Sequence, residues 1–332
     1  MTSVFLTGAS GFLGGHILRE LRALECEVKA LSRRPESDAA IAALGAVPVR
    51  AELSDRASLR AAMAGCEAVF HVAADTSMWR QQAAAQTATN VQGTENLLRA
   101  SEAENVRAFV HTSSVAAHSH LAHGVIDEST PQRGAESFIN YERTKFLGEQ
   151  LVRKSSVPWI VFNPTHILGP GDRHSWARLI MLVDAEKLPG IPPGIGTFAD
   201  VREIAKAQVR AWQQQRFGQA YIVGGVQLSF LDFVHPVGAA LGKRTPRRAT
   251  PAFALMTFAR LSNTWAHITG KEPDITPEAA MLTCHALYAD SSKAIRELDY
   301  VETPFDALLK DTLDWMRKEG MVQRSKSATG MR

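Results

Sequence analysis

The chain has 332 residues, of which 45% are hydrophobic and 21% charged, a composition typical of a globular protein with about two domains' worth of core. Its formal net charge of +3 is too small to indicate an extended nucleic-acid surface. The sequence contains no apolar stretch long enough to predict a membrane span and no leader-like N-terminus. Its three scattered cysteines indicate a reducing compartment, so we expect a cytoplasmic location.

A strand, a glycine-rich turn and a helix open the chain. Residues 3–7 are an apolar run, and residues 12–24 carry apolar side chains at helical spacing. Between them lies Thr7-Gly8-x-x-Gly11-x-x-Gly14. Glycines let the backbone turn sharply and let a pyrophosphate approach the amides at a helix N-terminus. A glycine-rich turn can be only a turn, but this one joins a strand to a helix and therefore predicts dinucleotide binding.

The second strand, residues 27–31, ends in Ser32-Arg33-Arg34-Pro35. An acidic residue at this position binds the ribose 2′-hydroxyl of NAD, whereas an arginine accommodates the 2′-phosphate of NADP. Arg33 and Arg34, with no carboxylate beside them in this run, favour NADP. A solvated basic turn and NAD as cofactor are the alternatives.

Strands and helices continue to alternate up to residue 162. Strands are expected at 47–50, 68–72, 106–112 and 159–162, separated by helices that begin near residue 55, run through 90–99 and span 138–154. This order predicts an α/β protein with a Rossmann-type doubly wound parallel sheet, whose ligands bind beyond the carboxyl ends of the strands.

From residue 168 the alternation fails and proline and glycine become dense. We expect residues 1–165, with 197–226 returning to them, to form the nucleotide-binding domain. Residues 166–196 and 227–320 would form a smaller, mostly helical substrate lobe, and 321–332 a flexible tail. The apolar helix expected at 251–268 is interpreted as core or pocket lining. Three nearby histidines, at 118, 120 and 123, lack the other ligands of a metal shell, and no metal is predicted.

Tyr141 and Lys145 are four residues apart in the helix expected at 138–154, which places them on one face. An ammonium beside a phenol favours the phenolate, so Lys145 is expected to lower the pKa of Tyr141 toward the range useful for proton exchange. Alone, this spacing is a weak signal.

Several motifs in order and spacing resemble those of the extended short-chain dehydrogenase/reductases, which include dihydroflavonol reductases, cinnamoyl-type reductases, 3β-hydroxysteroid dehydrogenases and nucleotide-sugar epimerases. The resemblance covers nearly the whole chain. It rests on Gly8-x-x-Gly11-x-x-Gly14, His71-Val-Ala-Ala74, Asn90-Val-x-Gly-Thr94, Thr112-Ser-Ser114, Tyr141-x-x-x-Lys145 and Asn163-Pro164.

The resemblance implies catalytic roles for Ser114, Tyr141 and Lys145. It implies cofactor contacts from Gly8, Ser10, Gly11, Phe12, Leu13, Arg33, Arg34, Leu53, Ala73, Ala74, Asn90, Thr112, Tyr141, Lys145, Pro164, Thr165 and His166. Asn163 departs from the pattern, since many relatives have arginine there.

The sequence therefore predicts an NADP-dependent oxidoreductase that interconverts a ketone or aldehyde and an alcohol on a hydrophobic small molecule, with Tyr141 as the acid/base. A nucleotide-sugar epimerase or dehydratase is the alternative enzyme, and a nucleotide-sensing regulatory protein is the alternative without turnover. The resemblance also implies a homodimer.

Overall fold

The computed structural model describes residues 2–323, which form two compact units. The first unit contains residues 2–165, 201–224 and 289–301, and the second contains 166–200, 225–288 and 302–323. Residues 197–200 and 225–226, expected in the first unit, belong to the second, and residues 289–301, expected in the second, join the first. Residues 289–301 do so because helix α12 (Ser292–Leu298) is held there: the Arg210 guanidinium donates to the Leu298 carbonyl at 2.6 Å, and the Tyr221 hydroxyl to Glu297 at 3.0 Å.

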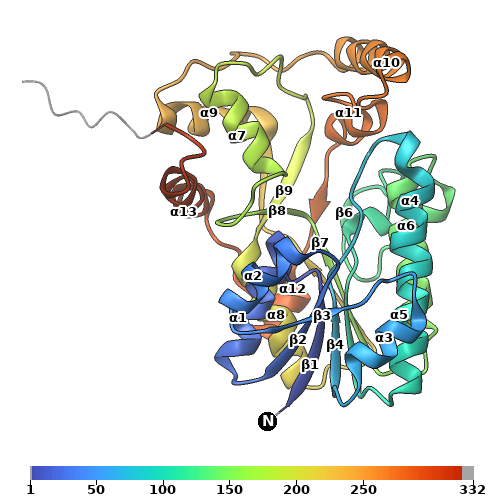
Figure 1. The fold of residues 1–332 in the computed structure, drawn as a ribbon. Helices are drawn as coiled ribbons and strands as arrows, with labels where there is room; N and C mark the ends of the chain where they lie inside the picture. The colour runs from blue at the N-terminus through green and yellow to red at the C-terminus, as the bar shows by residue number, and fades with distance from the viewer. Residues whose placement is uncertain (1, 324–332) are drawn as a thin grey trace, which may run out of the picture. The chain divides into compact units, whose positions relative to one another are not determined.

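A parallel sheet of seven strands forms the centre of the first unit within the described residues, in the order β10-β7-β5-β4-β1-β2-β3 (Figure 1). All pairs are parallel, and crossovers join them, so the doubly wound fold predicted from the sequence is confirmed. The strands are β1 (Ser3–Thr7), β2 (Glu27–Ser32), β3 (Val47–Arg50), β4 (Ala68–His71), β5 (Ala108–Thr112), β7 (Trp159–Pro164) and β10 (Gln219–Val223).

Helices cover both faces of this sheet. On one face α1 packs against α8, and on the other α3, α5 and α6 lie together (Figure 1). Phe5, Val69 and Phe109 point from neighbouring strands into the apolar layer beneath α3 and α5. The elements are α1 (Phe12–Ala23), α2 (Pro35–Ala43), α3 (Arg56–Met63), α4 (Ala83–Thr87), the π-helical η2 (Ala88–Gln92), α5 (Gly93–Ala103), η3 (Val115–Ala117), α6 (Asn140–Arg153) and α8 (Val201–Gln213).

The second unit combines a small sheet with helices. Its strands β8 (His166–Leu168), β9 (Ile195–Asp200) and β11 (Val226–Ser229) pair in the order β11-β9-β8, a sheet that the sequence did not predict. Its helices are α7 (Trp176–Asp184), α9 (Phe230–Leu241), α10 (Ala252–Thr269), α11 (Pro277–Cys284) and α13 (Phe305–Lys318). Val322, in the expected tail, is buried against this core; residues 324–332 of that tail lie outside the described part.

Helix α10 corrects one expectation. It forms where residues 251–268 predicted a helix, but only one side of it is core. Leu255 and Ala259 are buried, whereas Phe253 and Trp265 are 76% and 67% exposed. No helix between residues 2 and 323 is both long and apolar enough to cross a membrane.

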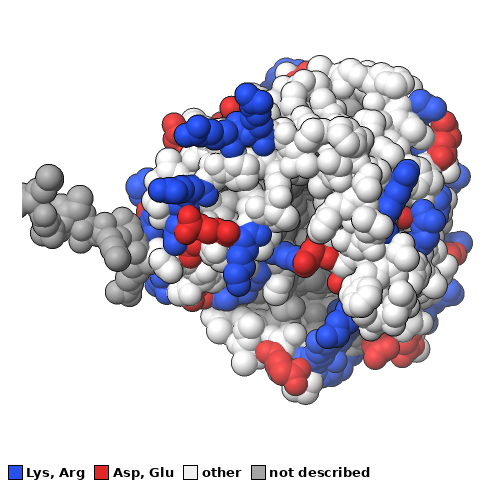
Figure 2. Space-filling view, turned by 90° about the horizontal axis from the view of Figure 1, so that it is seen from above, with Lys and Arg blue, Asp and Glu red and all other residues white. Residues whose placement is uncertain are grey.

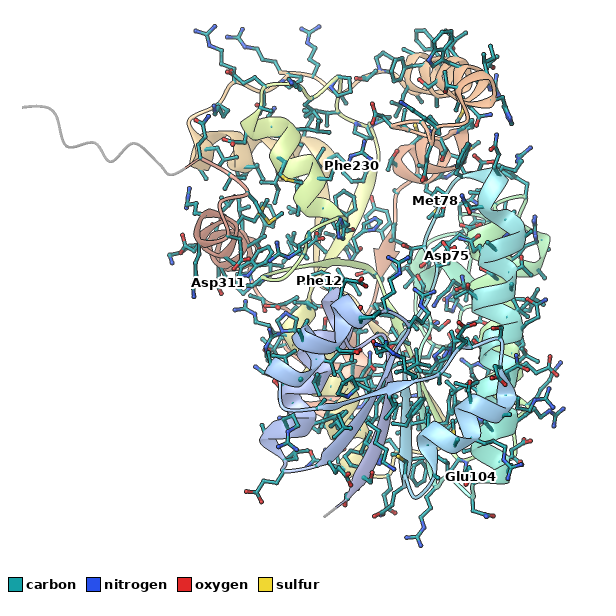
Figure 3. All side chains as sticks on the ribbon, in the orientation of Figure 1. Phe12, Asp75, Met78, Glu104, Phe230 and Asp311 are labelled. Atoms are coloured by element: carbon teal, nitrogen blue, oxygen red, sulfur yellow. The ribbon has the colours of Figure 1, made fainter. Side chains whose placement is uncertain are left out.

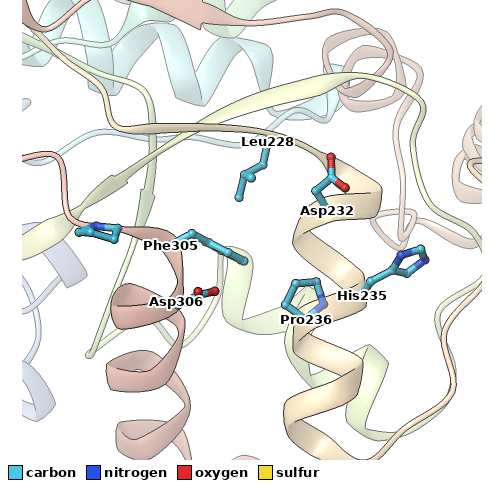
Figure 4. A pocket seen from close by; sticks show the side chains of 7 residues that line it. Leu228, Asp232, His235, Pro236, Phe305 and Asp306 are labelled. Atoms are coloured by element: carbon cyan, nitrogen blue, oxygen red, sulfur yellow. The ribbon is translucent and has the colours of Figure 1, made fainter.

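A cavity of about 420 Å³ opens in the second unit, between the first turns of α9 and α13 (Figure 4). Asp232, Phe305 and Asp306 are among its lining residues. Both carboxylates lie in the first turn of a helix, where negative charge is favourable, and the backbone nitrogen of Asp232 is capped by Ser229. The two carboxylates therefore have a structural explanation as stabilising charges at helix N-termini.

Candidate active site

The glycine turn after β1 brings three chain segments close together. Gly8 has a φ of +77°, and a Cβ there would lie 2.9 Å from the Ala73 nitrogen, so only glycine fits. A Cβ on Gly14 would lie 2.0 Å from the Gly8 carbonyl oxygen. Gly11 begins α1 without a side-chain cap, which leaves the first amides of the helix available to an anion.

A buried hydrogen-bond chain ties β1 to β4 and α5. The Thr7 hydroxyl accepts the Val72 and Ala73 amides, both at 3.1 Å, and with its two lone pairs used it donates its own proton to Nδ1 of His71 at 2.8 Å. Nε2 of His71 then donates to Thr94 at 2.9 Å, whose hydroxyl donates to the Asn90 carbonyl. Burial lowers the pKa of His71 to about 3, so this imidazole is neutral. These hydrogen bonds hold β1, β4 and α5 together at the candidate site, and no residue in them is charged.

Three arginines gather at the end of β2. Arg33 and Arg34 are exposed, as a site for an incoming phosphate requires. Arg50, paired with Ser32 in the β2–β3 register, donates to the Ser32 hydroxyl at 3.0 Å and forms an ion pair with Asp38. Arg50 was missed from the sequence; the signal was the strand register, which places it opposite Ser32.

Tyr141 lies in the first turn of α6, is half-buried, and has the Ser114 side chain beside its hydroxyl. Burial raises the pKa of Tyr141, the Ser114 hydrogen bond lowers it, and the Glu142 carboxylate raises it. The balance is upward, which corrects the expectation that Lys145 lowers this pKa. Tyr141 therefore holds its proton at neutral pH.

Lys145 is buried one turn further along α6. Its ammonium donates to the Thr112 carbonyl at the end of β5 at 2.9 Å. Burial lowers the pKa of Lys145 to about 8, and the Glu149 carboxylate opposes that change. The pKa of Lys145 is therefore close to physiological pH, so a small change in its surroundings changes how much of it is charged.

Glu149, fully buried on α6, is the most connected acid of the site and was not predicted from the sequence. Its carboxylate accepts four donors, three of them from outside α6: Ser113 at 2.6 Å, Asn163 at 2.7 Å and Gln132 at 2.7 Å, with Arg153 of α6 at 2.8 Å. Asn163, the departure from the family pattern, also donates to the Ser114 carbonyl at 3.1 Å. Glu149 therefore holds the segment that carries Ser114 and balances charge near Lys145.

A second buried acid orders the loop after η3. The Glu142 carboxylate accepts the Ser119 hydroxyl at 2.6 Å and the His120 amide at 2.7 Å. His120 Nδ1 also lies 2.9 Å from Glu142. Ser119 has a φ of +72°, an unfavourable conformation that these bonds maintain. The residue next to Tyr141 thus fixes the loop beside it.

Asn90 lies in the π-helical turn before α5, a local distortion often found at functional sites. Its amide oxygen accepts the Asp75 amide at 2.8 Å, and its nitrogen donates to Thr144 at 3.1 Å. Asn90 therefore joins the segment after β4 to α6. In Figure 3, Asp75 and Phe12 lie beyond the same edge of the sheet.

The other predicted cofactor residues of the first unit follow the carboxyl ends of its strands or open α1: Ser10, Phe12, Leu13, Leu53, Ala74, Pro164 and Thr165. His166, the next residue, begins β8 and is assigned to the second unit. There it packs among aromatic rings, 4.8 Å from Trp176 and 5.4 Å from Phe198 between ring centroids. Burial lowers the pKa of His166 to about 4.

The family model described as "NAD dependent epimerase/dehydratase family" matches residues 4–224, more than half of the chain. The chain belongs to this family. It is an NAD(P)-dependent oxidoreductase of the extended short-chain dehydrogenase/reductase type, as the resemblance predicted.

Curated family relatives match almost end to end. A putative dihydroflavonol 4-reductase from Synechocystis sp. is 27% identical and covers 96% of both chains. The sterol demethylase protein B of Methylococcus capsulatus is 29% identical over 96% of this chain and 100% of its own. A 4-hydroxy-2-methyl-3-oxo-4-farnesyl-3,4-dihydroquinoline-1-oxide ketoreductase from Stigmatella aurantiaca is 30% identical, with 89% and 91% covered.

Solved structures share the fold. The crystal structure of gox2253 is 28% identical, has a TM-score of 0.81 and covers 97% of this chain and 100% of that chain. A UDP-glucose-4-epimerase from Stenotrophomonas maltophila, solved with bound NAD, has a TM-score of 0.75 and covers 96% and 99%. At 22% identity the second likeness concerns the fold alone.

The residues present fit the dinucleotide that the family name implies. The uncapped start of α1 and the close turn at Gly8 suit a pyrophosphate, and the exposed Arg33 suits a phosphate group. Lys145 contacts the end of β5, and Tyr141 lies one turn before Lys145 on α6; ligands of open α/β sheets bind beyond the carboxyl ends of the strands.

Proposed function

We propose that the protein is an NADP-dependent oxidoreductase that interconverts a ketone or aldehyde and an alcohol on a hydrophobic small molecule. The observation that carries this proposal is the half-buried Tyr141 phenol, with the Ser114 hydroxyl beside it and the buried Lys145 ammonium one turn away. The names of relatives that act on sterols and a farnesylated ketone support a hydrophobic substrate. A screen of hydrophobic ketones with NADPH, followed by absorbance at the nicotinamide band, tests it.

The chain's own residues supply proton transfer and charge stabilisation. A bound nicotinamide supplies or accepts the hydride. The Tyr141 phenol, which carries a proton and has the Ser114 side chain beside it, is placed to donate that proton to a carbonyl oxygen. The Ser114 hydroxyl donates a hydrogen bond to the same oxygen and stabilises the charge that develops there. The Lys145 ammonium, held by the Thr112 carbonyl, places a positive charge one turn further along α6.

NADP preference is assigned to Arg33 and Arg34. Replacing both by Ala should weaken NADPH binding by about 10–100-fold, because two charge-assisted contacts to a phosphate are lost. NADH binding should change less than about threefold, since NADH has no 2′-phosphate. Fluorescence titration with each nucleotide measures both constants. Arg107→Ala, on an exposed turn before β5, serves as a control for the loss of one positive charge elsewhere. Equal losses for both nucleotides in the Arg33/Arg34 variant would contradict the assignment.

Glu149 is proposed as a positioning residue for Lys145 and Ser114. In Glu149→Gln the carboxylate that raises the pKa of Lys145 is gone, so that pKa should fall below about 8 and the alkaline limb of the kcat/KM profile should move to lower pH by up to about one unit. The unfolding free energy should fall by about 1–3 kcal/mol, because charge-assisted bonds become neutral. Glu136→Gln, which loses only an exposed ion pair, is the control. A destabilised variant with an unmoved pH profile would leave Glu149 a structural role only.

A nucleotide-sugar epimerase is the second candidate, favoured by the family name. Such an enzyme oxidises and re-reduces one substrate, so it regenerates its cofactor in each turnover. Analysis of the purified protein for tightly held nucleotide separates the two candidates. The homodimer, with α5 and α6 of two copies in contact, stays a prediction that light scattering checks.

A further inference from the structure

Helix α10 displays an apolar stripe on its outer side. Five large side chains along it are between 49% and 76% exposed: Phe253, Phe258, Leu261, Trp265 and Ile268. Its opposite side is anchored, because Leu255 and Ala259 are buried against Ala280 of α11. So many large exposed apolar residues on a single helix face indicate an interaction surface.

The polar groups on this outer side are already satisfied. The hydroxyls of Thr257, Thr264 and Thr269 donate to carbonyls one turn earlier in α10, at 2.8, 3.0 and 3.1 Å. A hydroxyl that is hydrogen-bonded to its own helix costs little free energy to remove from water. The threonines therefore do not oppose burial of the stripe in an apolar medium.

The same segment carries strong positive charge. Residues 233–271 contain six Lys and Arg and no Asp or Glu, whereas the net charge of the whole chain is only +3. Arg244, Arg247 and Arg248 lie in the loop between α9 and α10, and within residues 2–323 none of the three forms an ion pair; Lys243 lies 4.0 Å from Asp184. Figure 3 shows nitrogen-tipped side chains projecting from this loop, and Figure 2 shows Lys and Arg beside a broad uncharged area.

We propose that α10 and the loop before it bind the surface of an anionic lipid bilayer. An apolar helix face flanked by Arg and Lys is the pattern of a helix that lies in the headgroup region with its apolar side inserted. Each basic residue near an anionic surface adds to the attraction. A second copy of the chain is a poorer occupant, because pairing this face with itself would bring two basic segments together. α10 lies on the bilayer and does not cross it.

Vesicle sedimentation with the full chain tests the proposal. Wild-type protein should bind vesicles of equal parts phosphatidylcholine and phosphatidylglycerol, and bind pure phosphatidylcholine more weakly. Leu261→Ser with Trp265→Ser should lower the partition coefficient at least about tenfold, because two inserted apolar side chains are lost. Arg247→Gln with Arg248→Gln should lower it about fivefold per residue, and added salt should weaken wild-type binding. Val47→Ser, at another exposed apolar position, should bind like wild type.

Three results would overturn the proposal: no sedimentation with anionic vesicles, wild-type binding by the Leu261/Trp265 variant, or a wild-type dimer that this variant converts to monomer in lipid-free ultracentrifugation. Thermal unfolding checks that each variant folds. If the serine variant does not fold, the Arg247/Arg248 variant and the salt series decide, since those arginines contribute to no ion pair in the described chain.

Discussion

Replacing Tyr141 by Phe should lower kcat at least about a hundredfold while NADPH binding stays within a few-fold of wild type. The substitution removes one oxygen and keeps the ring, so α6 and its contacts with the sheet persist. What is lost is the phenol's proton, together with the hydrogen bond to Ser114. Steady-state kinetics with a ketone found in the screen, and fluorescence titration with NADPH, measure the two quantities.

The matched control is Tyr221→Phe. Tyr221 lies on the edge strand β10, and its hydroxyl donates to Glu297 at 3.0 Å. Burial raises the pKa of Tyr221 as well. Its removal should lower the unfolding free energy by about 1 kcal/mol and leave kcat unchanged. If Tyr141→Phe keeps more than about a tenth of wild-type kcat, Tyr141 is not the acid/base, and another donor must be sought.

The parts of the site that the sequence predicted are those with a short local pattern. Gly8, Gly11 and Gly14 are read from spacing because a tight turn between a strand and a helix admits few residue types. Ser114 and Tyr141 could also be proposed from the sequence, since each lies near the end or start of a recognisable element. Parallel pairing then brings these ends to one edge of the sheet, so their proximity follows from the fold.

The missed residues work through partners far away in sequence. Glu149 binds Ser113 and Gln132, 36 and 17 residues away, and nothing in its immediate neighbours distinguishes it from a solvated helix acid. Arg50 depends on the register of β2 and β3. The pKa of Tyr141 depends on burial, which no spacing rule contains, and this is why its direction was wrongly predicted. The exposure of α10 was missed for the same reason. The spacing of apolar residues in a helix is the same whether its outer side contacts protein or solvent.

Gly14→Ala should abolish most nucleotide binding and destabilise the first unit, whereas Gly15→Ala, one residue further, should do neither. A Cβ on Gly14 would lie 2.0 Å from the carbonyl oxygen and 2.6 Å from the carbonyl carbon of Gly8, both rigid backbone atoms. The turn must therefore shift, at a cost of about 3 kcal/mol or more in unfolding free energy. A Cβ on Gly15 meets nothing closer than the Ala9 oxygen at 3.6 Å, an ordinary contact. There alanine should stabilise α1 by about 0.5–1 kcal/mol through its higher helix propensity.

Thermal unfolding with and without NADPH separates these outcomes. Wild type and Gly15→Ala should both gain in midpoint temperature when the nucleotide is added, because ligand binding stabilises the folded state. Gly14→Ala should start lower and gain little, since its displaced amides no longer meet the pyrophosphate. Equal nucleotide-induced shifts in all three proteins would show that the turn after β1 does not hold the cofactor. Because the two variants add the same methyl group to adjacent residues of one helix, any difference between them reports on the turn itself.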